Sequence, residues 1–370
     1  MKSLLAITPF FGRSGSEIAL LNLLEELNKD FQVGIFTPRR KPDLQPLLSP
    51  GIDLLYPEEE MGSSLFFSKF RNIFNSISSF EKCLGRRKFD YILLNTFLSF
   101  KFYDIARKRA NRIILYIHET ELMLIGHDGE KLKKVLAEAS LILCSSHYVK
   151  NYLQIFCKNN KAIKVLHPPL NFGNFNLPVK PNNIRETLGF KTADFVWGMS
   201  GATTINKNPK MFIEAAQLLL SNYENLKFVW IGTRGNDAYE EYLKKYLKLY
   251  KLQNKICFIK KKDWDYYHYL NEFDGFVLTS FSESFSIAAL EAAAFNKPVV
   301  SFPCGGIMEA VPERLRWVTK EFSVKEISAL MEMLMKEKRK SLSLSEIQVL
   351  LANDKKHMTE KFKSFLSQIQ

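Results

Sequence analysis

Residues 273–311 read FDGFVLTSFSESFSIAALEAAAFNKPVVSFPCGGIMEAV, and this stretch decides the fold of the chain. Residues 274–280 and 298–302 have the β-branched and aromatic character of buried strands. The segment between them is rich in alanine, a strong helix former whose small side chain allows close packing on a sheet. The order strand, helix, strand predicts a right-handed parallel unit, in which a ligand binds beyond the carboxyl ends of the strands.

Two glutamates of this unit, Glu283 and Glu291, stand eight positions apart. A continuous helix would separate them by roughly 12 Å, so they do not form a close acid–base pair. We expect a serine within residues 284–286 to cap the helix, which leaves Glu283 in the turn and lets Glu291 lean back toward the same crevice. Free amides between the two favour an anion. The pattern predicts a ligand with hydroxyls at both ends and an anion in the middle, which describes a nucleotide sugar.

The composition limits the class of protein. A chain of 370 residues suits two domains. It has no apolar run of about 20 residues, and the apolar run at residues 4–7 is too short for a signal peptide, so we expect a cytoplasmic protein. The five cysteines are scattered without a C-x-x-C pair, which indicates neither a disulfide framework nor a zinc site.

The net charge of +13 raises the question of an anionic partner. The lysines are dispersed through predicted helices without a nucleic-acid motif, so we expect no nucleic-acid partner. Residues 65–84 carry apolar residues at helical spacing, with basic residues on or beside them. Such a helix can lie on the inner face of a membrane as a peripheral contact, although its apolar stripe more often faces the core of its own domain.

The first half of the chain alternates strands and helices. After a strand at residues 4–8, the loop at residues 9–17 contains Gly15 and leads into a helix at residues 18–27. His118 follows a predicted strand, where a neutral imidazole could bind a sugar hydroxyl, but a lone histidine is more often structural. Further strands are expected at residues 33–37, 91–95, 113–117, 141–145 and 164–166.

A segment dense in Pro, Gly and Asn, residues 167–181, marks the domain boundary. We expect a first domain at residues 1–178, a second at 179–350 and a terminal helix from 351. In the second domain Lys207 precedes a helix whose first turn contains Pro209, and a lysine there suits a diphosphate. The alternative is an exposed loop lysine. The expected strands are residues 195–199, 228–231 and 256–259, and the expected helices are residues 211–220, 324–336 and 345–370.

Several of these motifs together resemble the donor-site signature of the retaining GT-B glycosyltransferases of family 4. They are the stretch from Ser282 to Ala292, the Lys-Pro-Val-Val sequence at 297–300 and the Gly-Gly-Ile-Met-Glu sequence at 305–309. The resemblance is strong over residues 190–312 and weak over residues 1–170. It implies two doubly wound α/β domains that face a cleft, and a last helix that crosses back onto the first domain.

The resemblance also implies site residues and a reaction. Glu283 would contact the transferred sugar and Glu291 the ribose, while Lys207 would hold the diphosphate. It implies that Gly15 belongs to the N-terminal glycine turn, although Ser14 replaces the usual first glycine there, and that His118 approaches the sugar. The catalytic set is therefore Glu283, His118 and Lys207, and the donor-binding set is Gly15, Lys207, Arg234, Ser284, Phe285, Ser286, Ile287, Glu291, Gly305 and Gly306.

The implied activity is transfer of a sugar from a nucleotide sugar to a glycan or lipid-linked acceptor with retention, in cell-envelope or surface polysaccharide assembly. Neither a metal nor another cofactor is expected. The Asp-x-Asp motif at Asp263 and Asp265, a metal signature of another glycosyltransferase fold, is rejected because it lies late in the chain, in the wrong domain.

Three alternatives remain open. Gly201 and Ala202 stand where the family commonly has an arginine, for which Arg234 could compensate, so a silent nucleotide-sugar-binding scaffold is one alternative. An epimerase or phosphorylase of the same fold is another. In the third, Glu283 and Glu291 are ordinary solvated positions.

Overall fold

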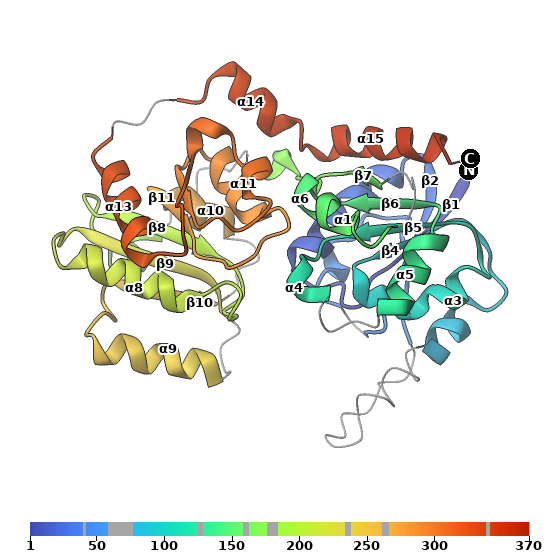
Figure 1. Ribbon diagram of the computed structural model, residues 1–370, viewed down its shortest axis with the longest axis horizontal. Coiled ribbons are helices and arrows are strands. Elements are labelled where there is room, and N and C mark those ends of the chain that lie inside the picture. The colour runs from blue at the N-terminus through green and yellow to red at the C-terminus, as the bar shows by residue number, and fades with distance from the viewer. Residues whose placement is uncertain are drawn as a thin grey trace. The chain divides into compact units, whose positions relative to one another are not determined.

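The structure is a computed structural model that describes residues 1–39, 42–57, 77–124, 129–157, 163–175, 184–233, 238–260, 266–337 and 341–369 (Figure 1). The chain divides into two compact units. The first contains Met1–Asn171 and Asn353–Gln370, and the second contains Phe172–Ala352. The expected boundary between residues 178 and 179 lies outside the described residues, as do most of the helix expected at 65–84 and the Asp-x-Asp motif. Residues 77–84 of that helix are described and are helical.

The first unit is built on a seven-stranded parallel sheet with the strand order β3-β2-β1-β4-β5-β6-β7. The strands are β1 Lys2–Ile7, β2 Phe31–Phe36, β3 Asp53–Leu55, β4 Phe89–Asn95, β5 Ala110–Ile117, β6 Leu141–Cys144 and β7 Ile163–Val165. The helices are α1 Gly15–Leu27, α3 Tyr103–Ala106, α4 Glu121–Leu124, α5 Gly129–Glu138, α6 His147–Leu153 and α15 Lys355–Ser367, with the 3-10 helices η1 Gln45–Leu47 and η2 Phe97–Phe102. Every strand that the sequence predicts here forms, and the short β3 was missed.

Both faces of this sheet are covered because alternate residues of each strand point to opposite sides. In β1, Leu5 and Ile7 belong to one apolar cluster, and Leu4 and Ala6 belong to a second. The central strands therefore read as continuous apolar runs, which is typical of parallel sheets.

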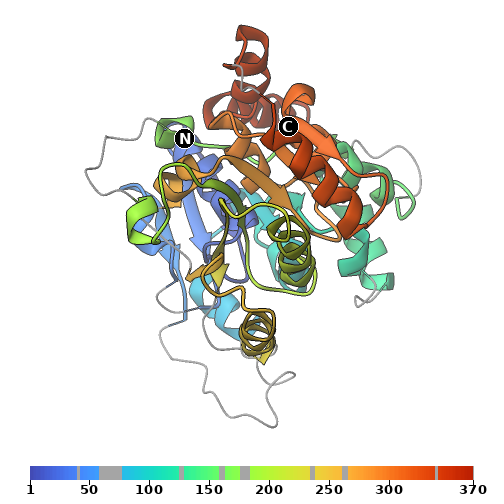
Figure 2. The ribbon, with the colours of Figure 1, turned by 90° about the vertical axis from the view of Figure 1, so that its left-hand side faces the viewer.

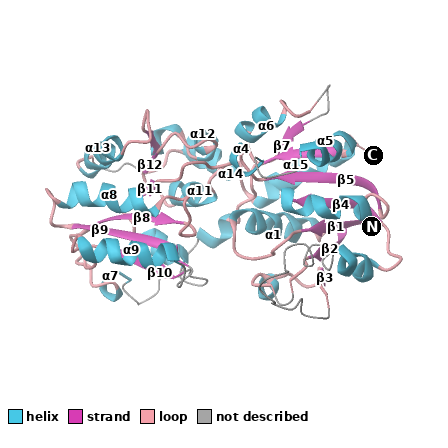
Figure 3. Cartoon of the chain, turned by 60° about the horizontal axis from the view of Figure 1, so that its bottom comes forward, coloured by secondary structure: helices cyan, strands magenta, loops and turns pink. Residues whose placement is uncertain are grey.

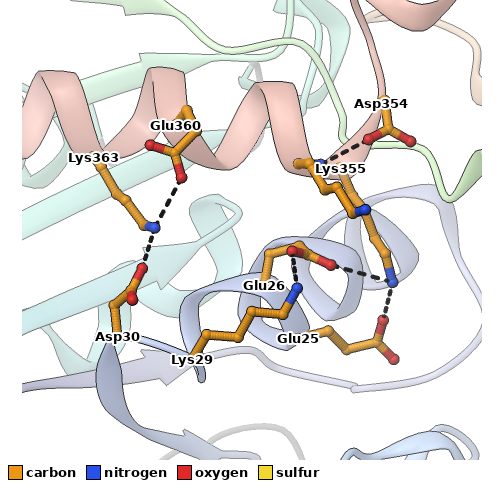
Figure 4. A network of polar contacts seen from close by, with 9 residues as sticks. Glu25, Glu26, Lys29, Asp30, Asp354, Lys355, Glu360 and Lys363 are labelled. Atoms are coloured by element: carbon orange, nitrogen blue, oxygen red, sulfur yellow. Dashed lines mark hydrogen bonds and ion pairs between the residues drawn. The ribbon is translucent and has the colours of Figure 1, made fainter.

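The C-terminal helix α15 packs against α1 in the first unit. Met358, Phe362 and Leu366 lie in the same apolar cluster as α1. Two ion pairs also link α15 to residues 25–30. Lys355 Nζ lies 2.8 Å from Glu25 Oε2, and Lys363 pairs with Asp30 (Figure 4). Neither ion pair is fully buried, so solvent screens both, and we attribute most of the stabilisation to the apolar face.

The helix expected over residues 345–370 is not continuous, and this expectation was wrong. The structure has α14 Leu344–Leu351 and then α15, with a break between them. The carbonyl of Asn353 accepts a hydrogen bond from the Leu170 amide at 2.8 Å, and Asp354 caps α15 through the Lys356 amide at 3.0 Å. These contacts occupy the break, so the chain leaves one helix and starts another where it joins the first unit.

The second unit is built on a six-stranded parallel sheet with the order β10-β9-β8-β11-β12-β13 (Figure 3). The strands are β8 Phe195–Ser200, β9 Leu226–Thr233, β10 Ile256–Lys260, β11 Gly275–Leu278, β12 Val299–Ser301 and β13 Arg316–Val318. The helices are α7 Ile184–Thr187, α8 Pro209–Leu220, α9 Ala238–Leu249, α10 Tyr266–Glu272, α11 Ile287–Ala294, α12 Ile307–Ala310, α13 Val324–Met335 and α14, with the 3-10 helices η3 Phe172–Phe175 and η4 Glu313–Leu315. Helices α8 and α13 pack together (Figure 2).

Two glycines let large rings fill the contact between β8 and β11. A β-carbon on Gly198 would lie 2.0 Å from the Phe273 ring, and one on Gly275 would lie 2.3 Å from the Trp197 ring. Trp197 and Phe273 are fully buried. This close approach packs the amino end of β11 against β8, and the candidate site lies beyond the opposite, carboxyl ends of the two strands.

No helix among the described residues is long and apolar enough to cross a membrane.

Candidate active site

The strand order of the second unit reverses between β8 and β11. From β8 the sheet continues through β9 and β10 on one side, and from β11 it continues through β12 and β13 on the other. Such a switch point opens a crevice at the carboxyl ends of the two strands, where ligands bind in open α/β sheets. The turn after β8 contains Lys207, and the turn after β11 contains Glu283.

An ion pair joins these two turns. Lys207 Nζ lies 2.5 Å from Glu283 Oε1, and the two side chains are 27% and 8% exposed. The stem of Lys207 passes over Gly201, whose built β-carbon would lie 3.4 Å from Lys207 Cδ. The sequence predicted both residues as site residues, and the structure brings them into direct contact.

Asn206 fastens the same two turns through its side chain and its carbonyl. Its Nδ2 donates to the Ser282 carbonyl at 2.9 Å, and its Oδ1 accepts from the Ser282 amide at 3.2 Å. The Asn206 carbonyl accepts from the Phe281 amide at 2.8 Å. These three bonds hold Lys207 opposite Glu283. Sequence reasoning missed Asn206, whose only signal is its place immediately before the lysine.

The glycine turn at 305–306 supports Glu283 from the other side. The Glu283 amide donates to the Cys304 carbonyl at 2.7 Å, and the Gly306 amide donates to the Glu283 carbonyl at 2.9 Å. Gly305 has a left-handed φ of 91°. A β-carbon on Gly306 would lie 2.1 Å from the Ser284 carbonyl oxygen, so only glycine fits between the two turns.

Helix α11 begins directly after the Glu283 turn. Ser286 is its N-cap residue, as the sequence predicted for a serine there, but it makes no capping hydrogen bond. The Phe285 side chain is buried in the core, while Ser284 and Ile287 are half-buried. Ser284, Phe285, Ser286 and Ile287 therefore surround the helix start, where the helix dipole favours negative charge.

Glu291 lies on α11 and is held by two tyrosines. Its carboxylate accepts from the Tyr266 hydroxyl at 2.8 Å and from the Tyr267 hydroxyl at 3.0 Å. Burial raises the pKa of Glu291 to about 7, and the two phenol hydrogen bonds oppose that shift. The Tyr267 ring packs against Phe175 and Phe295. The tyrosines were missed because they come from α10, outside the glutamate motif.

In the first unit the strand order reverses between β1 and β4. The loop after β1 ends at Gly15, the first residue of α1. The carboxylate of Glu17, which is buried, accepts a hydrogen bond from Ser16 Oγ at 2.9 Å and others from Ser14 and Thr8. The glycine loop is therefore organised around an acidic side chain that the sequence analysis did not assign.

His118 follows β5 in the first unit, one strand beyond the switch point. Its ring lies 4.0 Å from the Tyr116 ring, and its Nε2 has no hydrogen-bond partner among the described residues. Burial lowers the pKa of His118 to about 3, so the imidazole is neutral at physiological pH, as the sequence analysis assumed. The neighbouring Glu119 carboxylate accepts from the Phe97 amide at 2.9 Å, and burial raises its pKa to about 7.

The predicted residues fall into three groups. Lys207, Glu283, the start of α11 and the glycine turn form one connected site in the second unit. Glu291 lies on the helix that starts at this site and contacts two tyrosines there. Gly15 and His118 belong to the first unit, and Arg234 lies outside the described residues.

Two Rossmann-like parallel sheets, one in each unit, are the architecture of the GT-B class of α/β proteins. Residues 181–348 match the family model described as Glycosyl transferases group 1, and residues 13–172 match the model described as Glycosyltransferase Family 4. Both halves of the chain thus match glycosyltransferase models, and the chain belongs to the GT-B glycosyltransferases.

Solved structures share this fold at low sequence identity. Sucrose-phosphate synthase from Thermosynechococcus elongatus is 15% identical with a TM-score of 0.84, over 100% of this chain and 99% of that one. Anabaena Alr3699/HepE in complex with UDP-glucose is 16% identical with a TM-score of 0.78, over 100% of both chains. A glycosyltransferase from Rickettsia africae ESF-5 is 15% identical with a TM-score of 0.76, over 100% of this chain and 98% of that one. No curated protein sequence matches the chain.

Proposed function

We propose that the protein is a retaining glycosyltransferase of family 4 that transfers a sugar from a nucleotide sugar to an acceptor hydroxyl. The observation that carries the proposal is the Lys207–Glu283 ion pair at the switch point of the second sheet. It combines a cation for a diphosphate with a carboxylate for sugar hydroxyls at the start of a helix. HepE and a trehalose-6-phosphate protein of E. coli, both of similar fold, are described with UDP-glucose and UDP-2-fluoroglucose, which supports a UDP-sugar donor.

In the proposed reaction the diphosphate lies against Lys207 and the amino end of α11. The bond between the anomeric carbon and the diphosphate oxygen breaks, and the acceptor oxygen bonds to that carbon from the same face. The acceptor proton passes to the departing diphosphate oxygen. Lys207 and the helix dipole stabilise the negative charge that develops on the diphosphate, so the proposal needs no metal.

The remaining predicted residues position the sugar and the nucleotide. Glu283 and the neutral His118 orient the sugar, and Glu291 contacts the ribose. Gly15 lets the donor approach the first unit closely. Gly306 is in the expected donor-binding set, and because its amide is bonded to the Glu283 carbonyl, we propose that it acts by shaping the turn that holds Glu283.

The proposal extends to a glycan or lipid-linked acceptor and a role in surface polysaccharide assembly. The net charge of +13 supports a cytoplasmic enzyme that contacts the inner face of an anionic membrane peripherally. Nucleic acid is not a proposed partner.

A nucleotide-sugar panel tests the proposal. We expect one nucleotide sugar to raise the melting temperature of the protein, because a ligand that binds only the folded state stabilises it. The same donor should yield a glycoside with retained anomeric configuration, read by proton NMR. Absence of any thermal shift across UDP-, GDP- and ADP-sugars would refute the proposal, and a shift without transfer to any acceptor would favour the silent scaffold.

Donor affinity should depend on pH through Glu291. Because burial raises the pKa of Glu291 to about 7, the carboxyl is protonated below that pH and ionised above it. Only the ionised form accepts hydrogen bonds from both ribose hydroxyls, so affinity for the best-binding nucleotide sugar should rise from pH 6 to pH 8. Titration calorimetry at several pH values measures this rise.

Three variants assign that pH dependence. Glu291→Gln should weaken binding and flatten the profile. Glu119→Gln removes a carboxyl of the first unit whose pKa burial also raises to about 7, and it should leave the profile unchanged. Tyr266→Phe removes a hydrogen bond that lowers the pKa of Glu291, so the midpoint should move to higher pH. A profile that survives Glu291→Gln contradicts the assignment to Glu291.

A further inference from the structure

Helices α8 and α11 start at the two turns of the switch point, and both start in the same unusual way. The N-cap residue of α8 is Asn208, with φ 55° and ψ 56°, and that of α11 is Ser286, with φ 73° and ψ 79°. Both backbones are in the left-handed region, which asparagine tolerates and serine rarely adopts. The Asn208 side chain caps its helix, whereas Ser286 makes no capping hydrogen bond, so a serine in place of glycine there suggests another use for its hydroxyl.

Each of these side chains carries a buried hydrogen-bond donor without a partner among the described residues. They are Asn208 Nδ2 and Ser286 Oγ, on residues that are 5% and 7% exposed. Asn208 Oδ1 already accepts from the Met211 amide at 3.3 Å, which assigns its amide orientation and leaves Nδ2 as the free group. Buried polar atoms are normally paired, so two unpaired donors at adjoining helix starts indicate an absent acceptor.

Both donors belong to residues that lie close in the sequence to the charged residues of the site. Asn208 directly follows Lys207, and Ser286 lies three residues after Glu283. Thr279 Oγ1, at the end of β11, donates to the carbonyls of Lys207 at 3.0 Å and Asn208 at 3.1 Å. Both helices therefore start at the carboxyl ends of the neighbouring strands β8 and β11, beside the Lys207–Glu283 ion pair, and the two helix dipoles favour an anion there.

We propose that Asn208 Nδ2 and Ser286 Oγ donate hydrogen bonds to the diphosphate of the bound nucleotide sugar, one from each side of the switch point. This inference rests on the proposed function and adds two side-chain contacts to the backbone amides and Lys207. A serine hydroxyl moves to a new direction by a single χ1 rotation between staggered rotamers, without a change in the backbone.

Binding of nucleoside diphosphates to the purified full-length protein tests the inference. Ser286→Gly removes the hydroxyl and suits the left-handed backbone, so the melting temperature should not fall while the dissociation constant of the best of UDP, GDP and ADP rises about tenfold. Ser286→Ala should show the same loss of nucleotide affinity. This result would show that the loss comes from the missing hydroxyl and not from a more flexible backbone. Asn208→Asp keeps the capping oxygen but replaces the donor with a negative charge, so its loss should be larger.

The matched control is Lys251→Gly. Lys251 also has a left-handed φ, 54°, but it is an exposed residue in the turn after α9. Its replacement should leave nucleotide affinity unchanged. If wild-type protein binds a nucleoside diphosphate and Ser286→Gly binds it equally well, the inference is wrong and the proposed function stands. If Ser286→Gly loses affinity only for the nucleotide sugar, the hydroxyl contacts the sugar and the diphosphate assignment is overturned. If wild-type protein binds no nucleoside diphosphate or nucleotide sugar, the proposed function fails first.

Discussion

Replacing Lys207 with alanine is expected to reduce turnover at least about a hundredfold, because it removes the only side-chain cation that the described residues pair with Glu283 in the crevice. The same change should lower stability, since Glu283 is 8% exposed and would lose its ion-pair partner. A loss of about 1–3 kcal/mol corresponds to a fall of several degrees in melting temperature. Steady-state kinetics and thermal unfolding measure the two effects.

A double variant separates catalysis from folding. Glu283→Gln keeps the shape of the side chain and removes its charge, so Lys207→Ala combined with Glu283→Gln leaves no unpaired carboxylate. The double variant should recover most of the melting temperature of the wild type and remain inactive. If the double variant turns over within about tenfold of the wild type, Lys207 and Glu283 both serve only the fold, and both catalytic assignments are wrong.

Replacing Gly306 with alanine is expected to abolish activity by moving Glu283. The added β-carbon would lie 2.1 Å from the Ser284 carbonyl oxygen and 2.9 Å from Phe285 Cα, and both are backbone atoms that no side-chain rotation can clear. The two turns must therefore separate, which strains the Gly306–Glu283 hydrogen bond of 2.9 Å. A shift of about 1 Å at a positioning residue can cost about a hundredfold in rate. We expect a comparable loss in kcat, with weaker thermal stabilisation by the donor.

Gly129→Ala is the matched control for this change. Gly129 begins α5 in the first unit, and its built β-carbon meets nothing within 4 Å. Alanine favours a helix over glycine, so this variant should keep full activity and equal or higher stability. An active Gly306→Ala enzyme would mean that the glycine turn does not hold Glu283 in place, and the site geometry would need revision.

The local patterns determined the class of the fold and the identity of the charged residues. Strand–helix–strand alternation is visible in residues 273–311 because parallel strands are buried on both faces and read as apolar runs. The proline at the start of α8 and the glycines at 305–306 are local signals of the same kind. Each residue type marks a position whose backbone conformation it favours. These signals sufficed to select Lys207 and Glu283.

Only the tertiary structure decided which side chains meet. Asn206 bonds to Ser282, and Tyr266 and Tyr267 bond to Glu291, because β8 and β11 are neighbours in the sheet and α10 packs beside α11. Such contacts join residues that are 24 to 76 positions apart, and no periodicity in the sequence encodes them. The break between α14 and α15 was missed for the same reason: the hydrogen bond of Asn353 to Leu170, and not the local helix preference, sets it.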